Sequence, residues 1–327
     1  MHMKKNLLLA AILSVLLVCS ACRDAQENAN SSSQPGSSTQ GSSQALSSEA
    51  SSEINDMFPE SSEPQPDSRP EEDPTSSGKD VAALAQPIET AGVDLAGLDQ
   101  LDTQAATWGP GHAMDEENRP TACTQLQQEY GEHGAVFLLP DTEKNIYLTF
   151  DEGYENGYTS QILDVLREKE CPAVFFVTMD YVNRNPELIQ RMIDEGHVVG
   201  NHSVNHLSMP DLDNQTAVEE IAGLHNEVLE QFNYHMSLFR PPEGKWSEKS
   251  LELAKRMDYR TVLWSFAYAD YDVNNQPDPQ AAFERITSAA HSGAVYLLHA
   301  VSKTNTEILG DVIDNLRGQG YTFAKLQ

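Results

Sequence analysis

The fold of this chain is decided by one stretch, Ile146-Tyr-Leu-Thr-Phe-Asp-Glu-Gly-Tyr154. Apolar residues at alternate positions of this stretch predict a buried β-strand. The strand ends in two adjacent carboxylates, Asp151 and Glu152, and in Gly153, which favours a turn. A carboxylate at the carboxyl end of a core strand lies where α/β folds place their chemistry, although such a pair can also cap a helix or stabilise a turn.

The alternation of a strand with a helix continues through the remainder of the chain. Further strands are expected over 135–139, 173–177, 197–200, 237–239, 261–264, 293–298 and 321–324, and helices from near residues 125, 159, 186, 216, 247, 279 and 305. Strands and helices that alternate at this length predict an α/β fold with a parallel sheet and helical crossovers. About seven such units favour a closed or nearly closed barrel over an open sheet.

Polar side chains follow the predicted strands at their carboxyl ends. In a barrel these ends converge on one face, so side chains that are distant in the sequence are expected to meet there. The residues in these positions are Asp151, His202, His206, Arg240, Asp270 and His299.

The first 22 residues have the pattern of a secretory signal peptide. Lys4-Lys5 precedes an apolar run from Leu7 to Val18, which is too short to span a membrane comfortably. Ser20-Ala-Cys22 resembles a bacterial lipobox, so Cys22 is expected to become a lipid-bearing first residue, with cleavage without lipid as the alternative. The expected location is the outer face of the bacterial cytoplasmic membrane, with the lipid as the only membrane contact.

Residues 23–105 have the composition of a disordered tether. They are rich in Ser, Pro, Gln and acidic residues, and their apolar residues are too few to offset chain entropy. The segment holds 16 acidic and 3 basic residues, which contribute −13 of the formal net charge of −29. The remaining negative charge argues against nucleic-acid binding and against electrostatic attraction to anionic lipids.

Two segments are expected after the tether. Residues 106–139 form an N-terminal extension that packs on the barrel, with Trp108-Gly-Pro-Gly111 near its start. Residues 140–327 form the barrel domain. Cys123 and Cys171 lie in these segments, and both a single disulfide and two buried thiols are compatible with their number. We expect a monomer.

The histidine pair His202 and His206 suggests a metal site. Their spacing of four would let both imidazoles reach one ion from a helical turn. Two histidines and one carboxylate leave open positions for water and substrate, which is the layout of a hydrolytic metal site. A lone pair with this spacing can also be incidental.

Arg240 and His299 each allow a structural and a catalytic interpretation. Arg240 can be an ion-pair partner, but the rigid turn that follows it could aim the backbone N–H of Glu243 at a developing oxyanion. His299 can be a core histidine, but a nearby acid such as Asp270 would raise its pKa and make it a general acid. No serine lies in a nucleophile-elbow context, so covalent catalysis is not favoured.

Five segments in this order resemble the motifs of the polysaccharide deacetylases, which are also called the NodB homology family or carbohydrate esterase family 4. They are Thr149-Phe-Asp-Glu-Gly153, His202-Ser-Val-Asn-His206, Arg240-Pro-Pro-Glu-Gly244, Trp264 through Tyr271, and Leu297-Leu-His299. The resemblance covers about residues 140–327. It implies a distorted (β/α)7-type barrel and metal-assisted hydrolysis of acetyl amides.

The resemblance also implies roles for the acid and base groups. By motif position, Asp151 would be the general base on the attacking water, and Arg240 would orient it. Asp270 would tune His299, which would protonate the departing amine.

The metal ligands implied by the same motifs are Glu152, His202 and His206. They would hold a divalent ion, and zinc is the ion expected. The family pattern has a second aspartate where this chain has Glu152, whose extra methylene moves the carboxylate. Three further residues would contact the substrate: the Glu243 N–H and Leu297 at the acetyl group, and Tyr271 in place of a groove tryptophan.

A narrower likeness is to the peptidoglycan N-acetylmuramic acid deacetylases that prepare muramic δ-lactam in spore cortex. It rests on Asp151-Glu-Gly-Tyr-Glu-Asn-Gly-Tyr-Thr159, Asp194-Glu-Gly-His197, Arg240-Pro-Pro242 and Leu297-Leu-His-Ala-Val-Ser302. Trp108-Gly109 also matches and extends this likeness to about Ala106. The partner implied is the peptidoglycan glycan strand. The alternatives are a deacetylase that acts on N-acetylglucosamine, chitin or O-acetyl-xylan, and an inactive glycan-binding lipoprotein.

Overall fold

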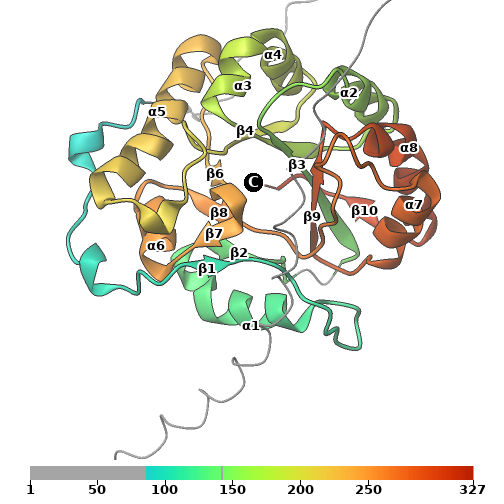
Figure 1. Ribbon diagram of the computed structural model, residues 1–327, viewed down its shortest axis with the longest axis horizontal. Helices are drawn as coiled ribbons and strands as arrows, with labels where there is room; N and C mark the ends of the chain where they lie inside the picture. Colours follow the sequence, from blue (N-terminus) through green and yellow to red (C-terminus); the bar gives the residue numbers. More distant parts are fainter. Residues whose placement is uncertain (1–85, 141–142, 327) are drawn as a thin grey trace, which may run out of the picture. The chain divides into compact units, whose positions relative to one another are not determined.

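A computed structural model of the chain describes residues 86–140 and 143–326 (Figure 1). The predicted signal peptide, Cys22 and the tether up to residue 85 lie outside the described residues. Within the described part, no helix is both long and apolar enough to cross a membrane.

A parallel sheet forms the centre of the domain, and its strands run in the order β10-β3-β4-β5-β6-β8-β2, with β9 also paired to β3 (Figure 1). The sheet curls into an incomplete barrel, which confirms the predicted α/β barrel in a distorted form. The strand bounds are β2 Ala135–Val136, β3 Asn145–Glu152, β4 Ala173–Val177, β5 Val198–Asn201, β6 Leu238–Phe239, β8 Arg260–Val262, β9 Ala294–His299 and β10 Thr322–Phe323.

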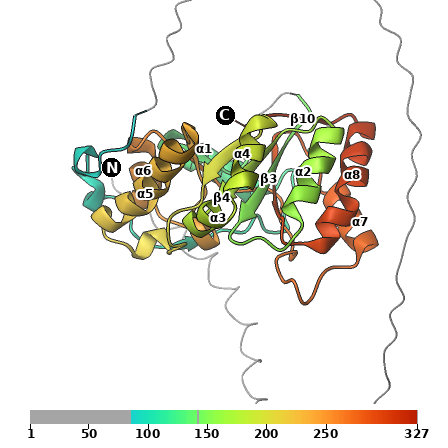
Figure 2. The same cartoon turned by 90° about the horizontal axis from the view of Figure 1, so that it is seen from above.

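The helices surround the sheet on its outer side (Figure 1). Their bounds are α1 Thr121–Tyr130, α2 Thr159–Glu168, α3 Met179–Arg184, α4 Pro186–Asp194, α5 Asn214–Phe232, α6 Glu248–Arg256, α7 Pro279–Ser288 and α8 Lys303–Gly318. Side-chain caps begin several of them: the Asp213 carboxylate accepts from the Thr216 N–H, and the Ser302 hydroxyl accepts from the Asn305 N–H. In the perpendicular view, α2 and α8 stand side by side next to β3 (Figure 2).

Side chains on the two faces of β3 pack into two different hydrophobic clusters. Ile146, Leu148 and Phe150 pack outward against the helices, in a cluster that includes residues of α2, α5 and α8. Tyr147 faces inward and packs with apolar residues of the barrel interior. Because side chains alternate along a strand, Asp151 continues the inward row and Glu152 the outward row.

The folded part begins earlier than the sequence predicts. The tether was expected to extend to residue 105, but two short 3₁₀ turns, Thr90–Gly92 and Leu98–Gln100, lie against the domain. Leu98 is 0 % exposed, and the Ile88 N–H donates to the Asn226 side chain at 2.8 Å. The tether prediction is therefore wrong for residues 86–105, because a few apolar side chains anchor a segment that is polar overall.

The segment 106–139 is part of the sheet as well as an extension. β1 (Ala106–Thr107) pairs antiparallel with β7 (Lys245–Trp246), while β2 pairs with β8 within the main sheet. Cys123 and Cys171 are both buried and free, so the two-thiol alternative describes this structure.

Candidate functional site

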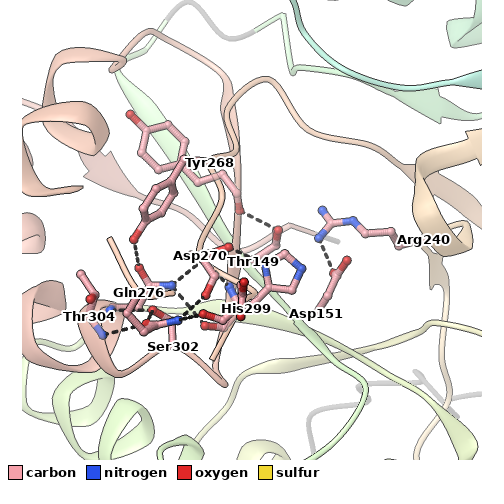
Figure 3. Close-up of polar contacts among 12 residues, drawn as sticks. Thr149, Asp151, Arg240, Tyr268, Asp270, Gln276, His299, Ser302 and Thr304 are labelled. Atoms are coloured by element: carbon pink, nitrogen blue, oxygen red, sulfur yellow. Dashed lines mark hydrogen bonds and ion pairs between the residues drawn. The ribbon is translucent and has the colours of Figure 1, made fainter. Parts of the chain in front are cut away.

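The end of β3 holds Asp151 against a buried arginine. Arg240 follows β6 and donates through Nη1 to Asp151 Oδ1 at 2.7 Å (Figure 3). The guanidinium also donates to the carbonyl oxygens of Val262 and Leu263, at 3.0 and 3.2 Å, and its carbon lies 4.2 Å from the Phe176 ring centroid. These contacts use the planar donor fork of arginine, so they fix where Arg240 meets Asp151.

The charges around Asp151 keep it ionised. Burial is the largest influence and would raise the pKa of this carboxyl. The positive charge of Arg240, then His202 and His299, together with the Arg240 hydrogen bond, outweighs burial and lowers the pKa of Asp151 below its usual value. Asp151 is therefore a carboxylate at neutral pH and can accept a proton.

His299 lies at the end of the neighbouring strand β9, where it is the register partner of Asp151. Its Nδ1 faces Oδ1 of Asp270 at 2.7 Å, and its backbone N–H donates to Asp270 Oδ2 at 2.8 Å (Figure 3). Because Nδ1 is held by Asp270, Nε2 is the ring nitrogen left for substrate. Burial lowers the pKa of His299, but the Asp270 hydrogen bond and charge and the Asp151 charge raise it above its usual value.

Sequence reasoning missed the residues that hold Asp270. The Asn305 side chain donates to Asp270 Oδ2 at 2.6 Å, and the Tyr268 hydroxyl donates to Asn305 Oδ1. The Gln276 side chain donates to the Asp270 carbonyl oxygen at 3.0 Å and accepts from the Ser302 hydroxyl at 2.7 Å (Figure 3). A signal for Asn305 existed in the sequence, since it lies in the first turn of the helix that follows His299.

The structure brings His202 and His206 together, but on a loop rather than on the predicted helical turn. Their Nε2 atoms are 3.2 Å apart, and His202 Nε2 lies 3.6 Å from Asp151 Oδ2. His202 donates through Nδ1 to the Arg240 carbonyl oxygen at 2.8 Å, so its Nε2 lone pair faces His206 and Asp151. Burial lowers the pKa of His202 to about 4, which keeps this imidazole neutral at pH 7.

The third predicted ligand, Glu152, does not join the two histidines. Its side chain is fully buried, and neither carboxylate oxygen has a hydrogen-bond partner. Glu155, Tyr181 and Thr159 lie near this carboxylate. Burial, followed by the charges of Glu155 and Asp151, raises its pKa well above the usual value. The physical reason is the strand alternation, which turns Glu152 away from the barrel interior.

The predicted set of three metal ligands is therefore not assembled. Two imidazoles whose Nε2 atoms face each other suit a divalent ion, but Glu152 does not complete the set. Within residues 86–140 and 143–326, no group of three or more His, Cys, Asp or Glu side chains has the arrangement of a metal site.

The predicted substrate contacts lie around the same end of the barrel. Leu297 is buried on the inward face of β9, and Tyr271 is 62 % exposed with its ring centroid 5.8 Å from that of His299. Glu243 has a positive φ of 58° in the turn after Arg240, and its carboxylate pairs with Lys245 at the surface. An open pocket of about 450 Å³ adjoins the histidine loop, and it is lined by Gly153, Tyr154, Thr178, Asp180, Val204, Asn205 and His206.

Comparisons with known proteins agree with this geometry. The family model described as polysaccharide deacetylase matches residues 139–262. Over 244 residues the chain is 41 % identical to the peptidoglycan-N-acetylmuramic acid deacetylase PdaA of Bacillus subtilis, covering 72 % of this chain and 91 % of the relative. It is 34 % identical over 202 residues to a peptidoglycan-N-acetylglucosamine deacetylase of Bacillus cereus, covering 61 % of this chain and 94 % of the relative. The solved structure of Bacillus subtilis PdaA, described as a family 4 carbohydrate esterase, superposes with a TM-score of 0.65 at 40 % identity, over 69 % of this chain and 96 % of that one.

Proposed function

This chain belongs to the polysaccharide deacetylase family and is a peptidoglycan de-N-acetylase, and we propose that it removes the acetyl group from N-acetylmuramic acid. The observation that carries the proposal is the pairing of Asp151 with His299 across β3 and β9, one group ionised and the other poised to hold a proton. Such a pair can serve amide hydrolysis, which needs a base for the water and an acid for the amine.

The proposed reaction assigns one proton to each group. Asp151, oriented by Arg240, takes a proton from water as the water oxygen attacks the acetamide carbonyl carbon. The C–N bond then breaks, and His299 Nε2 donates its proton to the departing amine, so the products are acetate and a free amino sugar. Asp270 holds Nδ1 of the same ring and stabilises the protonated imidazole.

A divalent ion is a further part of the proposal. Deacetylases of this family are generally metal-dependent, and His202 and His206 are the residues that would hold an ion, with zinc expected. An ion held there would polarise the acetamide carbonyl as a Lewis acid and so assist the steps assigned above to Asp151 and His299. His206→Ala should abolish stoichiometric metal in elemental analysis, and full activity of exhaustively chelated, metal-free protein would refute the metal proposal.

N-acetylmuramic acid is proposed as the substrate because of the relationship to the Bacillus subtilis deacetylase named for that sugar. Muramic acid carries a lactyl group on its 3-oxygen, so the site must leave room for a substituent there. The motif likeness over 151–159 and 297–302 supports the further proposal that this reaction is a step toward muramic δ-lactam in spore cortex. N-acetylglucosamine is the second candidate, since the Bacillus cereus relative is named for it.

The decisive experiment is mass spectrometry of digested peptidoglycan after incubation with the enzyme. Loss of one acetyl group from muramic acid residues is expected, and Asp151→Asn is the matched inactive control. Deacetylation confined to glucosamine residues would move the proposal to the second candidate. No deacetylation of either sugar by a folded, metal-loaded enzyme would support the inactive glycan-binding lipoprotein.

We also propose that the protein is exported and lipid-anchored through Cys22 on the outer face of the cytoplasmic membrane. The lipobox-like Ser20-Ala-Cys22 supports this, and the acyl chains would provide the membrane affinity. Cys22→Ala should move the protein from the membrane to the soluble fraction. Unchanged fractionation would show that Cys22 is not the anchor.

A further inference from the structure

We propose that Glu220 is a positioning residue, which clamps the loop 203–206 and thereby holds His206 in the reaction site. Glu220 lies on α5 and is 3 % exposed, although no site residue lies on that helix. Burial of a carboxylate destabilises the fold unless its oxygens accept hydrogen bonds. The groups that donate to Glu220 therefore show which part of the structure it stabilises. The inference deepens the deacetylase proposal, on which it rests.

The polar half of the clamp uses both carboxylate oxygens of Glu220. Oε2 accepts from the Asn205 backbone N–H at 2.8 Å, and Oε1 accepts from the Asn205 side-chain amide at 2.6 Å. The Glu220 carbonyl oxygen accepts from the Val204 N–H at 3.1 Å. Three donors of the two residues that immediately precede His206 thus end on one residue of α5.

The apolar half of the clamp lies one turn further along α5. A Cβ atom added to Gly223 would lie 3.0 Å from Cγ2 of Val204, so the loop approaches the helix backbone closely at this point. Residues three apart share one face of a helix, so Glu220 and Gly223 present a single docking surface to the loop. At the start of the loop, the Asn201 side chain also donates to the Ile221 carbonyl oxygen at 2.8 Å.

The loop needs such support because its backbone is strained. Ser203 and His206 have φ values of 71° and 56°, in the left-handed region that costs an ordinary residue about 1–2 kcal/mol. Strain of this kind persists only where the surroundings determine the conformation. The conformation held here brings His206 Nε2 to 3.2 Å from His202 Nε2, so a relaxed loop would separate the two rings.

The clamp draws its strength from a carboxylate, because both oxygens of Glu220 accept from Asn205 in charge-assisted hydrogen bonds. A glutamine offers one acceptor and an N–H₂ group, so the side-chain contact survives only if the Asn205 amide turns over, and neither contact then has a charged acceptor. Glu220→Gln therefore weakens the clamp without a change in side-chain size. Glu219→Gln is the matched control, because Glu219 is the exposed neighbour on the same helix.

The test measures kcat and KM for deacetylation together with ¹⁵N-edited NMR signals of the histidine rings. In Glu220→Gln, kcat should fall about 10- to 100-fold with KM unchanged, as for other residues that orient reactive side chains. The ring signals of His206 should shift, while those of the buried His291, which contacts Ser265 and not α5, stay. Wild-type kcat with unshifted His206 signals would overturn the proposal, and so would equal shifts of both rings, which would indicate general loosening.

A second variant tests the clamp from its apolar side and serves if Glu220→Gln does not fold. Gly223→Ala should favour α5 by about 1 kcal/mol in helix propensity, which offsets the cost of moving Val204, so the variant should fold; the displacement of Val204 should lower kcat. Gly310→Ala is the matched control, since Gly310 lies within α8 and a Cβ atom there would make only ordinary van der Waals contacts, with Lys169 and Val165. Equal kcat in Gly223→Ala and Gly310→Ala would contradict the clamp. The ring signals are read without substrate, so they test the clamp even if the wild-type enzyme proves to have another activity.

Discussion

Nδ1 of His299 lies 2.7 Å from Oδ1 of Asp270, and the Asp270 side chain is completely buried while the histidine ring remains partly exposed. This arrangement ties the proton on His299 to a carboxylate that solvent does not reach. Asn305 and the His299 backbone N–H hold the other oxygen of Asp270, so the carboxylate cannot turn away. Asp270, fixed in place by Asn305, thereby raises the pKa of His299 and favours its protonated form.

The first prediction concerns the pH dependence of the rate. The base Asp151 must be ionised, and its lowered pKa places the acidic limb below about pH 3.8, its ordinary value. The acid His299 must be protonated, and its raised pKa places the basic limb above its ordinary value of 6.5. Asp270→Asn should move the basic limb of a kcat/KM profile to lower pH and leave the acidic limb in place. A basic limb that does not move would show that another group provides it.

The second prediction separates the acid from the base by the choice of substrate. His299→Ala should reduce hydrolysis of the amide about 10²- to 10⁴-fold, because the amine cannot leave without a proton. An aryl ester with a good leaving group should lose much less, and the two rates are compared in the same variant. Equal losses on amide and ester would mean that His299 is not the general acid.

The third prediction concerns the stability that depends on Arg240. Removal of one partner from a buried ion pair leaves the other charge uncompensated, so Arg240→Met should cost about 3–5 kcal/mol of unfolding free energy. Denaturation in urea at neutral pH measures this loss. At acidic pH, where Asp151 can be protonated, the variant should recover part of it. The surface variant Arg184→Met, which breaks an exposed pair with Asp180, should change stability little.

The fourth prediction tests the position of Glu152. Its folded-state pKa is raised well above the value of 4.5 expected when unfolded. As pH rises between these values, only the unfolded state ionises, so wild-type stability falls. Glu152→Gln should abolish this fall and be more stable at neutral pH, while retaining activity. Loss of bound metal and activity in Glu152→Gln, but not in the exposed control Glu168→Gln, would instead make Glu152 a ligand.

The fifth prediction concerns the start of the folded part. A protein that begins at Gln86 should match the full chain in thermal unfolding and in rate on soluble peptidoglycan fragments. A protein that begins at Ala106 loses the buried Leu98 and the Ile88–Asn226 contacts, and should be less stable by at least about 2 kcal/mol. Equal Tm values for the two truncated proteins would show that residues 86–105 do not support the fold.

Much of the site could be predicted because it lies at strand ends. The alternating pattern located β3, β4 and β9, and convergence of parallel strand ends brought Asp151, Arg240 and His299 together. Asn305 and Glu220 do not lie at strand ends. Asn305 could have been found only from its place in the first turn of the helix that follows His299, and Glu220 acts through contacts between a helix and a loop that no local periodicity records.

Two errors came from treating neighbours in the sequence as neighbours in space. Glu152 follows Asp151 directly, but β3 continues through both residues and sends their side chains to opposite faces. The spacing of His202 and His206 suggested a helical turn, whereas two residues with positive φ form a loop that brings the rings together. Within the described residues 86–105, Leu98 is the one buried side chain, and a single leucine in a polar segment was too weak a signal to predict packing.

The register of β3 with β9 has a consequence for the order of folding. The two strands are far apart in the sequence, and β10, which follows β9, pairs with the start of β3. Pairings between segments so distant in the sequence form slowly, because the loop between them must close first. Asp151 and His299 therefore meet only when β9 docks on β3, so the acid–base pair is absent from any folding intermediate in which this pairing has not formed.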